Sequence, residues 1–159
     1  MTFTLYAATV PAFMQFLNAQ ISLVDKAEAF CLQQQISPEA MLNERIIDDM
    51  RPLSYQLKSV VSHSIKAIHA LAQGEFAPDG SAAPQSFAEA RSMLRDALNQ
   101  LSALSAEAVN KHTGSAMVFR DGEYRVDFTA ETFLMTFTRP NFYCHATTAY
   151  NILRMKGLE

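Results

Sequence analysis

The chain has 159 residues, of which 49% are hydrophobic and 18% are charged, and its net charge is -3. Its basic residues are scattered rather than arranged in a stripe, which speaks against nucleic acid as a partner. No apolar run approaches the roughly 20 residues that a membrane span needs, and no charged leader with a cleavage site is found, so we expect a cytoplasmic protein without a membrane partner.

A long first helix is predicted from Tyr6 to about Gln34, because its apolar residues recur at spacings of three and four, as in a bundle helix. This seam consists of Val10, Phe13, Met14, Leu17, Ile21, Val24 and Cys31. Glu28 lies on the continuation of the seam, where an apolar residue is expected. A second apolar set lies on another side of the helix and consists of Phe16, Leu23, Ala27 and Phe30. The helix therefore has more apolar surface than one core contact needs.

Two further helices are predicted in the next forty or so residues. Ser37-Pro38 is a cap followed by a proline at the first helical position, which predicts a short helix through Leu42. A second long helix begins at Pro52 and runs to about Gln73. Its inward stripe consists of Leu53, Leu57, Val60, Val61, Ile68 and Leu71. His63 lies near the edge of this stripe, whereas Lys58 lies on the polar side.

A surface loop and a third helix follow. Residues 74–85 are rich in Gly, Pro, Ser and Ala, which is typical of a loop. Ser86 and Glu89 form a capping box that opens the third helix, which we expect to end near Ser105. Its seam consists of Phe87, Ala90, Leu94, Ala97, Leu101 and Leu104.

A β-hairpin is predicted next, because apolar residues alternate with polar ones between residues 117 and 128. We expect Asp121-Gly122 to form a two-residue type I′ turn, which pairs Phe119 with Tyr124. The same register places Arg120 opposite Glu123. A hairpin of this size does not stand alone, so its apolar face must cover one end of the helices.

The last helix, from Thr129 to Gly157, is apolar on more than one face. At helical spacing its main stripe combines three apolar and three polar residues: Phe133, Phe137, Asn141, His145, Thr148 and Ile152. A second stripe consists of Met135, Phe142, Ala146, Ala149 and Leu153. Pro140 removes one backbone donor and should kink the helix just before the polar triplet.

The last helix also carries a family resemblance. Its run Pro-Asn-Phe-Tyr-x-His-x-Thr-Thr-Ala-Tyr-x-Ile-Leu-Arg-x-x-Gly is joined by an upstream set: Leu42, Asn43, Arg45, Asp49, Met50, Pro52, Leu53 and Gln56. Together they resemble an uncharacterised branch of the DinB/YfiT-like superfamily, a domain of unknown function. The resemblance implies an all-α, DinB-like four-helix bundle, here with a short β-hairpin before the last helix, as a single domain over residues 1–159. For the wider superfamily it implies a metal site of three histidines, one on the second helix and two spaced i, i+4 on the fourth.

The candidate site combines Asn141, His145 and Thr148 with His63 of the second helix and Glu28 of the first. Residues on facing helices of a bundle can converge on one point in its core. His63 and His145 are the candidate ligands for a divalent metal such as zinc or nickel, but Asn141 stands where the superfamily has another histidine. The alternatives are a polar pocket for water or a small ligand, and a network of hydrogen bonds that serves the structure alone. We expect His145 to be buried and hydrogen-bonded to another helix.

Three functions fit this sequence. The first is a protein that binds at most a small ligand in a polar core pocket, with a degenerate metal site. The second is a metal-dependent enzyme, for which the resemblance suggests hydrolase or thiol-transferase chemistry. The third is a structural protein that acts as a homodimer through its first and last helices, which would bury their second apolar stripes; neighbouring elements of the same chain could cover these stripes instead. The apolar context of Cys31 and Cys144 favours two buried thiols.

Overall fold

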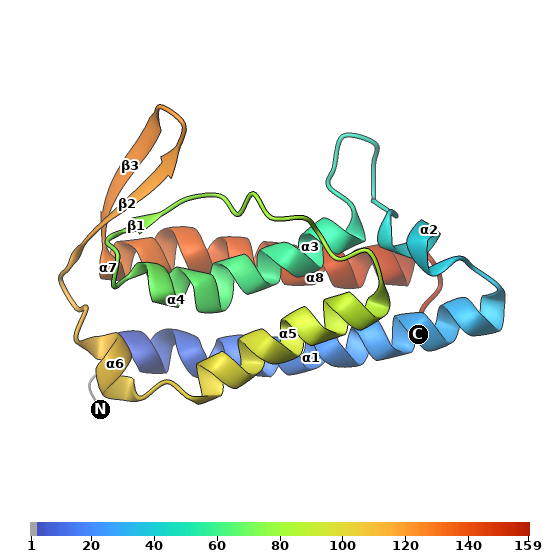
Figure 1. Ribbon diagram of the computed structural model, residues 1–159, viewed down its shortest axis with the longest axis horizontal. Coiled ribbons are helices and arrows are strands. Elements are labelled where there is room, and N and C mark those ends of the chain that lie inside the picture. The colour runs from blue at the N-terminus through green and yellow to red at the C-terminus, as the bar shows by residue number, and fades with distance from the viewer. Residues whose placement is uncertain (1–2) are drawn as a thin grey trace.

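The computed structural model describes residues 3–159 and confirms the predicted helical bundle with a hairpin (Figure 1). The four bundle positions are held by α1, by α3 with its continuation to α4, by α5, and by α7 with its continuation to α8. The elements are α1 (Leu5–Gln34), α2 (Pro38–Leu42), α3 (Leu53–Val61), η1 (Ser62–Lys66), α4 (Ala67–Ala70), β1 (Glu75–Phe76), α5 (Phe87–Ser102), α6 (Ala106–Asn110), β2 (Ala116–Asp121), β3 (Tyr124–Thr129), α7 (Ala130–Thr132), η2 (Phe133–Thr138) and α8 (Arg139–Met155).

Side-chain caps fix where the helices begin. The hydroxyl of Thr4 accepts from the amide of Ala7 at the start of α1, and Ser37 caps α2 with a proline directly behind it. Ser86 accepts from the amide of Glu89 at the start of α5, which is one half of the predicted capping box, whereas the carboxylate of Glu89 accepts from the amide of Gln85 (2.8 Å) rather than from that of Ser86. α5 ends at Ser102, slightly before the predicted end, because Ser105 caps the additional short helix α6.

The second bundle helix is continuous from Leu53 to Ala70 but contains a π turn, η1, that the sequence analysis did not predict. Two serines bond back to the preceding turn: the hydroxyl of Ser62 donates to the carbonyl of Lys58 (3.2 Å), and that of Ser64 donates to the carbonyl of Val60 (2.8 Å). Such side-chain bonds compete with the regular ladder and favour a local distortion. The π turn places His63 one residue into the distorted segment.

The last bundle helix is also distorted, at the place that Pro140 predicted. The π turn η2 ends at Thr138, directly before α8. The proline lacks an N–H group, and the amide of Asn141 donates from its side chain to the carbonyl of Phe137 at 2.7 Å. The distortion therefore takes the form of a π turn, which is a known way for a helix to absorb such a break.

The hairpin forms, but its predicted register is wrong, because the turn lies one residue later in the chain than predicted. The pairs are Asp121 with Tyr124, Phe119 with Val126 and Arg120 with Arg125, so that Gly122-Glu123 is the turn. Gly122 has a φ of 59°, and a glycine at the first central position is the pattern of a type II′ turn. The predicted type I′ turn over Asp121-Gly122 would have forced Asp121 into a positive φ. A positive φ is more strained for an aspartate than for a glycine.

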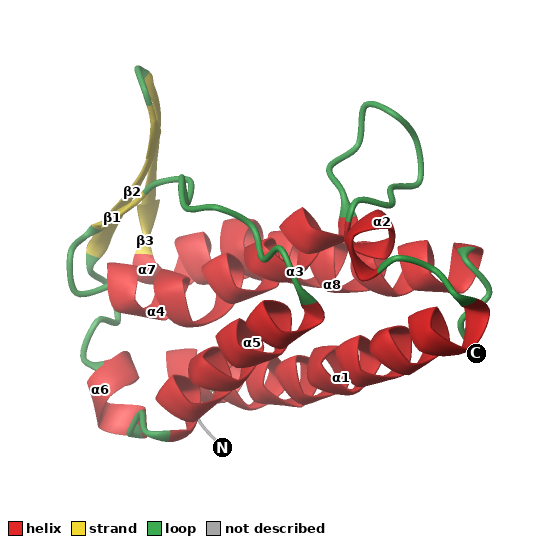
Figure 2. Ribbon diagram, turned by 45° about the vertical axis from the view of Figure 1, so that its right-hand side comes forward, coloured by secondary structure: helices red, strands yellow, loops and turns green. Residues whose placement is uncertain are grey.

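A third strand extends the hairpin. β1 pairs in parallel with β2, with Glu75 next to Val118, and gives the sheet order β1-β2-β3. Arg120 therefore binds Glu75 (3.1 Å) rather than Glu123. The sheet stands at the end of the bundle where α4 and α7 lie (Figure 2). From there, the loop between β1 and α5 runs back along the second bundle helix.

α1 is long and apolar enough to cross a membrane by length and composition, which the sequence analysis had not expected. The reason is that its first charged residue is Asp25. Before Asp25 the helix consists of apolar residues and uncharged polar ones. In the bundle this helix packs along α5, and Phe13 and Leu17 on it are fully buried. A core helix passes the same test of length and composition, so the test is weak support for a membrane span.

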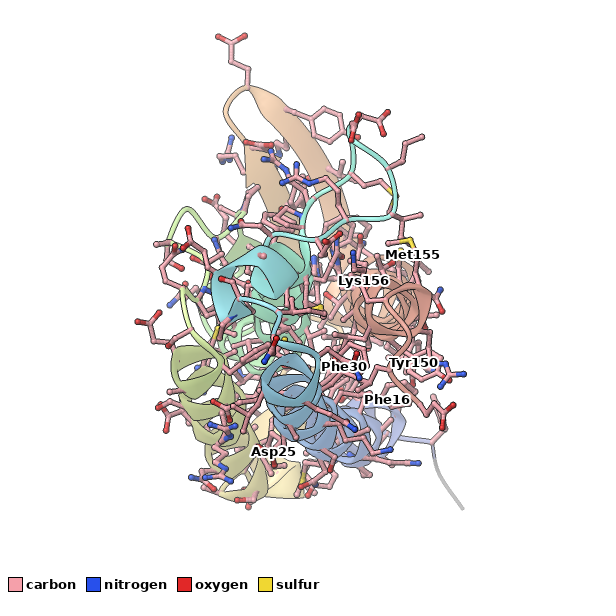
Figure 3. All side chains as sticks on the ribbon, turned by 90° about the vertical axis from the view of Figure 1, so that its right-hand side faces the viewer. Phe16, Asp25, Phe30, Tyr150, Met155 and Lys156 are labelled. Atoms are coloured by element: carbon pink, nitrogen blue, oxygen red, sulfur yellow. The ribbon has the colours of Figure 1, made fainter. Side chains whose placement is uncertain are left out.

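The second apolar stripe of α8 is mostly covered within the chain, whereas that of α1 is mostly only partly buried. Phe142, Ala146, Ala149 and Leu153 of α8 are each at most 2% exposed, as is Ala27 of α1. Phe16 and Phe30 on α1 remain only partly buried. In the end-on view of Figure 3 these two phenylalanines and Tyr150 lie on the side where α1 and α8 are neighbours. The chain itself therefore covers most of the second stripe of α8 but little of that of α1, so the surface left for the predicted homodimer is smaller than the sequence suggested.

Candidate functional site

The polar residues of the second and last bundle helices meet at a cavity of about 190 Å³ beside the two π turns. Residues of the loop between β1 and α5 and of the strands β1 and β2 complete its lining. The lining consists of Tyr55, Lys58, Ser59, Ser62, His63, Phe76, Pro78, Asp79, Phe119, Phe137, Asn141 and His145. Three of the five predicted site residues, His63, Asn141 and His145, therefore do come together.

His145 is held in one orientation by Gln56 of α3. Its Nδ1 lies 2.7 Å from Gln56 Oε1, and Gln56 Nε2 in turn donates to the carbonyl of Arg51 (2.9 Å). The second bond assigns the amide orientation, so Oε1 is the acceptor and His145 Nδ1 the donor. The neutral ring then carries its lone pair on Nε2. The predicted hydrogen bond to another helix is confirmed, but His145 is half-buried rather than buried.

His63 lies against His145 and has a nitrogen without a partner. The two rings are nearly parallel, with an interplanar angle of 15° and centroids 5.6 Å apart. The rings of Phe76 and Phe137 pack against His63 at centroid distances of 5.6 and 5.7 Å. His63 Nδ1 is buried and finds no hydrogen-bond partner within residues 3–159.

Burial keeps both imidazoles neutral. It lowers the pKa of His63 to about 4, with a further contribution from the charge of His145. Burial likewise lowers the pKa of His145. At neutral pH the cavity therefore presents two uncharged imidazole rings, one of them with a defined tautomer.

Two predicted site residues are not in the cavity. Thr148 is half-buried on α8 but is not part of the lining, and Glu28 points away toward α5, where it pairs with Arg91. The placement of Glu28 was predicted from a strict 3.5-residue repeat. An α-helix has 3.6 residues per turn, so its buried row drifts relative to that repeat. Ala27 and Cys31 are the buried residues of this turn, and Glu28 is exposed.

Gln56 and Lys58 belong to the site but were not among its predicted residues. Gln56 was noted only within the family motif, although an uncharged polar residue between Leu53 and Leu57 of an apolar stripe is the same signal that identified His145. Lys58 was assigned to the polar side of the helix, yet it is only 6% exposed. The loop between β1 and α5 covers it, and a local sequence pattern gives no information on such a cover.

The loop is fastened to the helix by two lysines. Lys58 Nζ donates to the carbonyl oxygens of Asp79 (2.6 Å) and Ser81, and it lies 5.9 Å from the ring centroid of Tyr55. Lys66 forms an ion pair with the carboxylate of Asp79, which also accepts from the amide of Ser81 (2.9 Å). Burial alone would raise the pKa of Asp79, but these hydrogen bonds hold it well below its usual range.

The donor set does not fit a three-histidine metal site. A catalytic zinc site needs three protein ligands, usually imidazole nitrogen or carboxylate oxygen. Asn141 takes the position of the third histidine, and its side-chain nitrogen is bonded to the helix backbone. Within residues 3–159 no group of three His, Cys, Asp or Glu side chains is arranged to hold a metal ion.

Comparison with known proteins supports the fold. Residues 5–159 match the family described as a domain of unknown function, DUF1993. The crystal structure of a DinB family member protein from Shewanella denitrificans is similar, with a TM-score of 0.79 and 25% sequence identity over 98% of this chain and 87% of that one. No curated protein matches the sequence.

Proposed function

The chain belongs to the DUF1993 family, an uncharacterised branch of DinB-like bundles, and from this premise we propose that its polar cavity binds a small ligand without catalysing a reaction. One observation carries the proposal: three polar side chains from two helices, His63, Asn141 and His145, meet at one cavity among aromatic rings. His145 is bonded to Gln56 through Nδ1, which leaves the lone pair of its Nε2 for another partner. A ligand in the cavity would supply such a partner.

The lining suggests the size and shape of the ligand. Three phenylalanines, Phe76, Phe119 and Phe137, line the cavity together with the polar His63, Asn141 and His145. A volume of about 190 Å³ is below the roughly 300–1,000 Å³ of pockets that hold drug-sized ligands. The cavity therefore fits a compact molecule that has an apolar body and one polar group.

The electrostatics support binding rather than acid–base catalysis. A general base works best when its pKa is close to the working pH. The pKa of His63 is about 4, so this imidazole is a weak base at neutral pH. The hydroxyl of Ser62, another polar group of the lining, already lies 3.3 Å from the carboxylate of Asp79.

NMR titration of the two cavity histidines tests this proposal. One-ring compounds that are uncharged, cationic or anionic are added to ¹⁵N-labelled protein, and the imidazole signals are followed. We expect at least one class to shift His63 and His145 while leaving the exposed His69 unchanged, and His63→Leu to weaken the same binding about tenfold, a loss of 1.4 kcal/mol. Compounds that bind the protein but never move the cavity signals would contradict the proposal.

A metal-dependent enzyme is the competing function, of hydrolase or thiol-transferase type. It is favoured by the bond from His145 Nδ1 to Gln56, because histidines that ligate metals usually donate their second nitrogen to such an orienting group. Elemental analysis of untagged protein distinguishes the two functions. One tightly held zinc or nickel ion per chain, lost in His145→Ala, would support the enzyme; we expect weak binding or none.

We also propose assembly as a homodimer through α1 and α8, on a smaller surface than the sequence suggested. Phe16, Leu23 and Phe30 of α1 are partly buried, and Tyr150 of α8 is 45% exposed on the same side of the molecule. Homodimer interfaces are richer in apolar and aromatic side chains than ordinary surface. The three residues of α1 belong to the interface that the sequence predicted, whereas Tyr150 lies outside the predicted stripes.

A cytoplasmic location is the remaining proposal, supported by the cysteines. Cys31 and Cys144 are both free, and reduced thiols persist in the cytoplasm. Cys31 is buried as expected, whereas Cys144 is exposed because it lies on the outer side of α8, next to the half-buried Tyr143 and His145.

A further inference from the structure

Lys58 is a buried cation that forms no ion pair with any other residue of the range 3–159. It lies in the lining of the cavity, and only 6% of its surface is exposed. Buried charges in proteins are normally paired, because the loss of hydration is otherwise uncompensated. The two carbonyl groups that accept from its Nζ are dipoles without net charge.

The other charges at the cavity cancel. The carboxylate of Asp79 is neutralised by its ion pair with Lys66 and accepts further hydrogen bonds from Ser62 and Ser81. The two imidazoles are uncharged at neutral pH, as argued above. Among residues 3–159, the ammonium of Lys58 is therefore the charge of the lining that has no ion-pair partner.

The ammonium also has a donor to spare. A lysine ammonium has three N–H groups, and two of them are used by the carbonyls of Asp79 and Ser81. The same two bonds fix the position of the Nζ, and Lys58 is one of the residues that line the cavity. A group that enters the cavity thus meets a fixed positive donor rather than a mobile surface lysine.

We infer that the ligand of this cavity is a small carboxylate with a compact aromatic or apolar body. This rests on the proposed function and specifies its ligand class. One carboxylate oxygen accepts from Lys58 Nζ, and a charge-assisted bond of this kind is roughly twice as strong as a neutral one. The body of the ligand packs against Phe76, Phe119 and Phe137. In its Nε2–H tautomer, His63 donates to the second oxygen, since its Nδ1 is too deeply buried to reach a ligand.

A cationic ligand is disfavoured by the same groups. Aromatic walls attract ammonium groups, but an unpaired lysine at the same cavity repels them, and the carboxylate of Asp79 is already occupied. An uncharged ligand would leave the ammonium of Lys58 without an ion-pair partner. The observation that decides between the three classes is therefore the buried and unpaired ammonium.

The test compares benzoate, benzamide and benzylamine, which share one ring and differ in charge. Each is titrated into the ¹⁵N-labelled full chain at neutral pH, with dissociation constants taken from the shifts of His63 and His145. We expect benzoate to bind at least about tenfold more tightly than benzamide, as one charge-assisted bond implies, and benzylamine to bind most weakly.

Lys58→Gln is the decisive variant, because glutamine keeps a donor for the loop carbonyls but carries no charge. We expect it to weaken benzoate binding about tenfold, to the level of benzamide, and to leave benzamide unchanged. Lys111→Gln, at an exposed position beyond α6, is the matched control and should change nothing. Should Lys58→Gln fail to fold, the ranking of the three compounds on the wild-type protein decides the question alone.

The outcomes separate this inference from the proposed function. Benzamide or benzylamine binding as tightly as benzoate, with shifts at the cavity histidines, would refute the carboxylate and leave the ligand pocket standing. No cavity shift with any of the three compounds would refute both. Benzoate binding that survives unchanged in Lys58→Gln would show that this lysine only fastens the loop.

Discussion

Acidification should destabilise this protein through His63, and the structure gives the size of the effect. The pKa of His63 is lowered from 6.5 to about 4 in the folded state, mainly by burial and further by the charge of His145. Between these two pH values the unfolded chain holds a proton on His63 that the folded chain does not. The free energy of unfolding therefore falls as the pH drops through this window.

The expected loss is about 3 kcal/mol, because each unit of pKa difference corresponds to 1.36 kcal/mol. The loss from His63 is absent above about pH 6.5 and complete below about pH 4, where both states are protonated. The pKa of His145 is lowered as well, so its contribution has the same sign. A loss of this size is a large part of the 5–15 kcal/mol that typically stabilises a domain.

Urea unfolding followed by circular dichroism at pH 3.5–7.5 measures the effect, with free energies from linear extrapolation. Many carboxyl groups also titrate in this range, so the informative quantity is the difference between the wild-type protein and His63→Leu. We expect that difference to change by about 3 kcal/mol between pH 7.5 and pH 4, and His69→Gln, at an exposed position, to follow the wild type. Parallel curves for wild type and His63→Leu would show that His63 is not desolvated as the structure implies.

Three further substitutions test the site, the core and the assembly. Gln56→Leu should cost about 1–3 kcal/mol in urea unfolding, because it leaves His145 Nδ1 without an acceptor, whereas Gln56→Glu keeps one. Phe142→Ala should cost about 3–5 kcal/mol in the same assay, since Phe142 is fully buried; an effect near zero would contradict this packing. Tyr150→Glu should turn a dimer into a monomer in sedimentation at micromolar concentration, while Tyr124→Glu at the hairpin should not; a monomeric wild-type protein would refute the dimer.

The helices could be predicted from the sequence because their signals are local. The 3.6-residue period locates a buried face, and a cap such as Ser86 with Glu89 locates its start. The hairpin was predictable for the same reason, through its alternating pattern. Its register was not, because the choice between Asp121-Gly122 and Gly122-Glu123 depends on which residue accepts a positive φ, and one glycine satisfies either turn in part.

The candidate site could be predicted only where polar residues interrupt an apolar face. His63, Asn141 and His145 satisfy that condition and do meet at one cavity. Lys58 does not, because it becomes buried when a loop some twenty residues later in the chain folds over it. β1 was missed on similar grounds, since a two-residue strand exists only through its pairing with β2.

The two π turns explain why the buried face of the last helix is shifted from the predicted one and why polar residues line the cavity. A π turn contains one more residue than an α turn, so the residues after it lie about 100° behind the position that an unbroken α-helix would give them. After η2, the row that enters the core contains Phe142 and Ala146, and Asn141 and His145 are turned to its side. η1 distorts the facing helix at His63. Polar groups that an undistorted bundle would bury in its centre are thereby brought to one edge of the core, under a loop held by Lys58, where a small molecule has room to reach them.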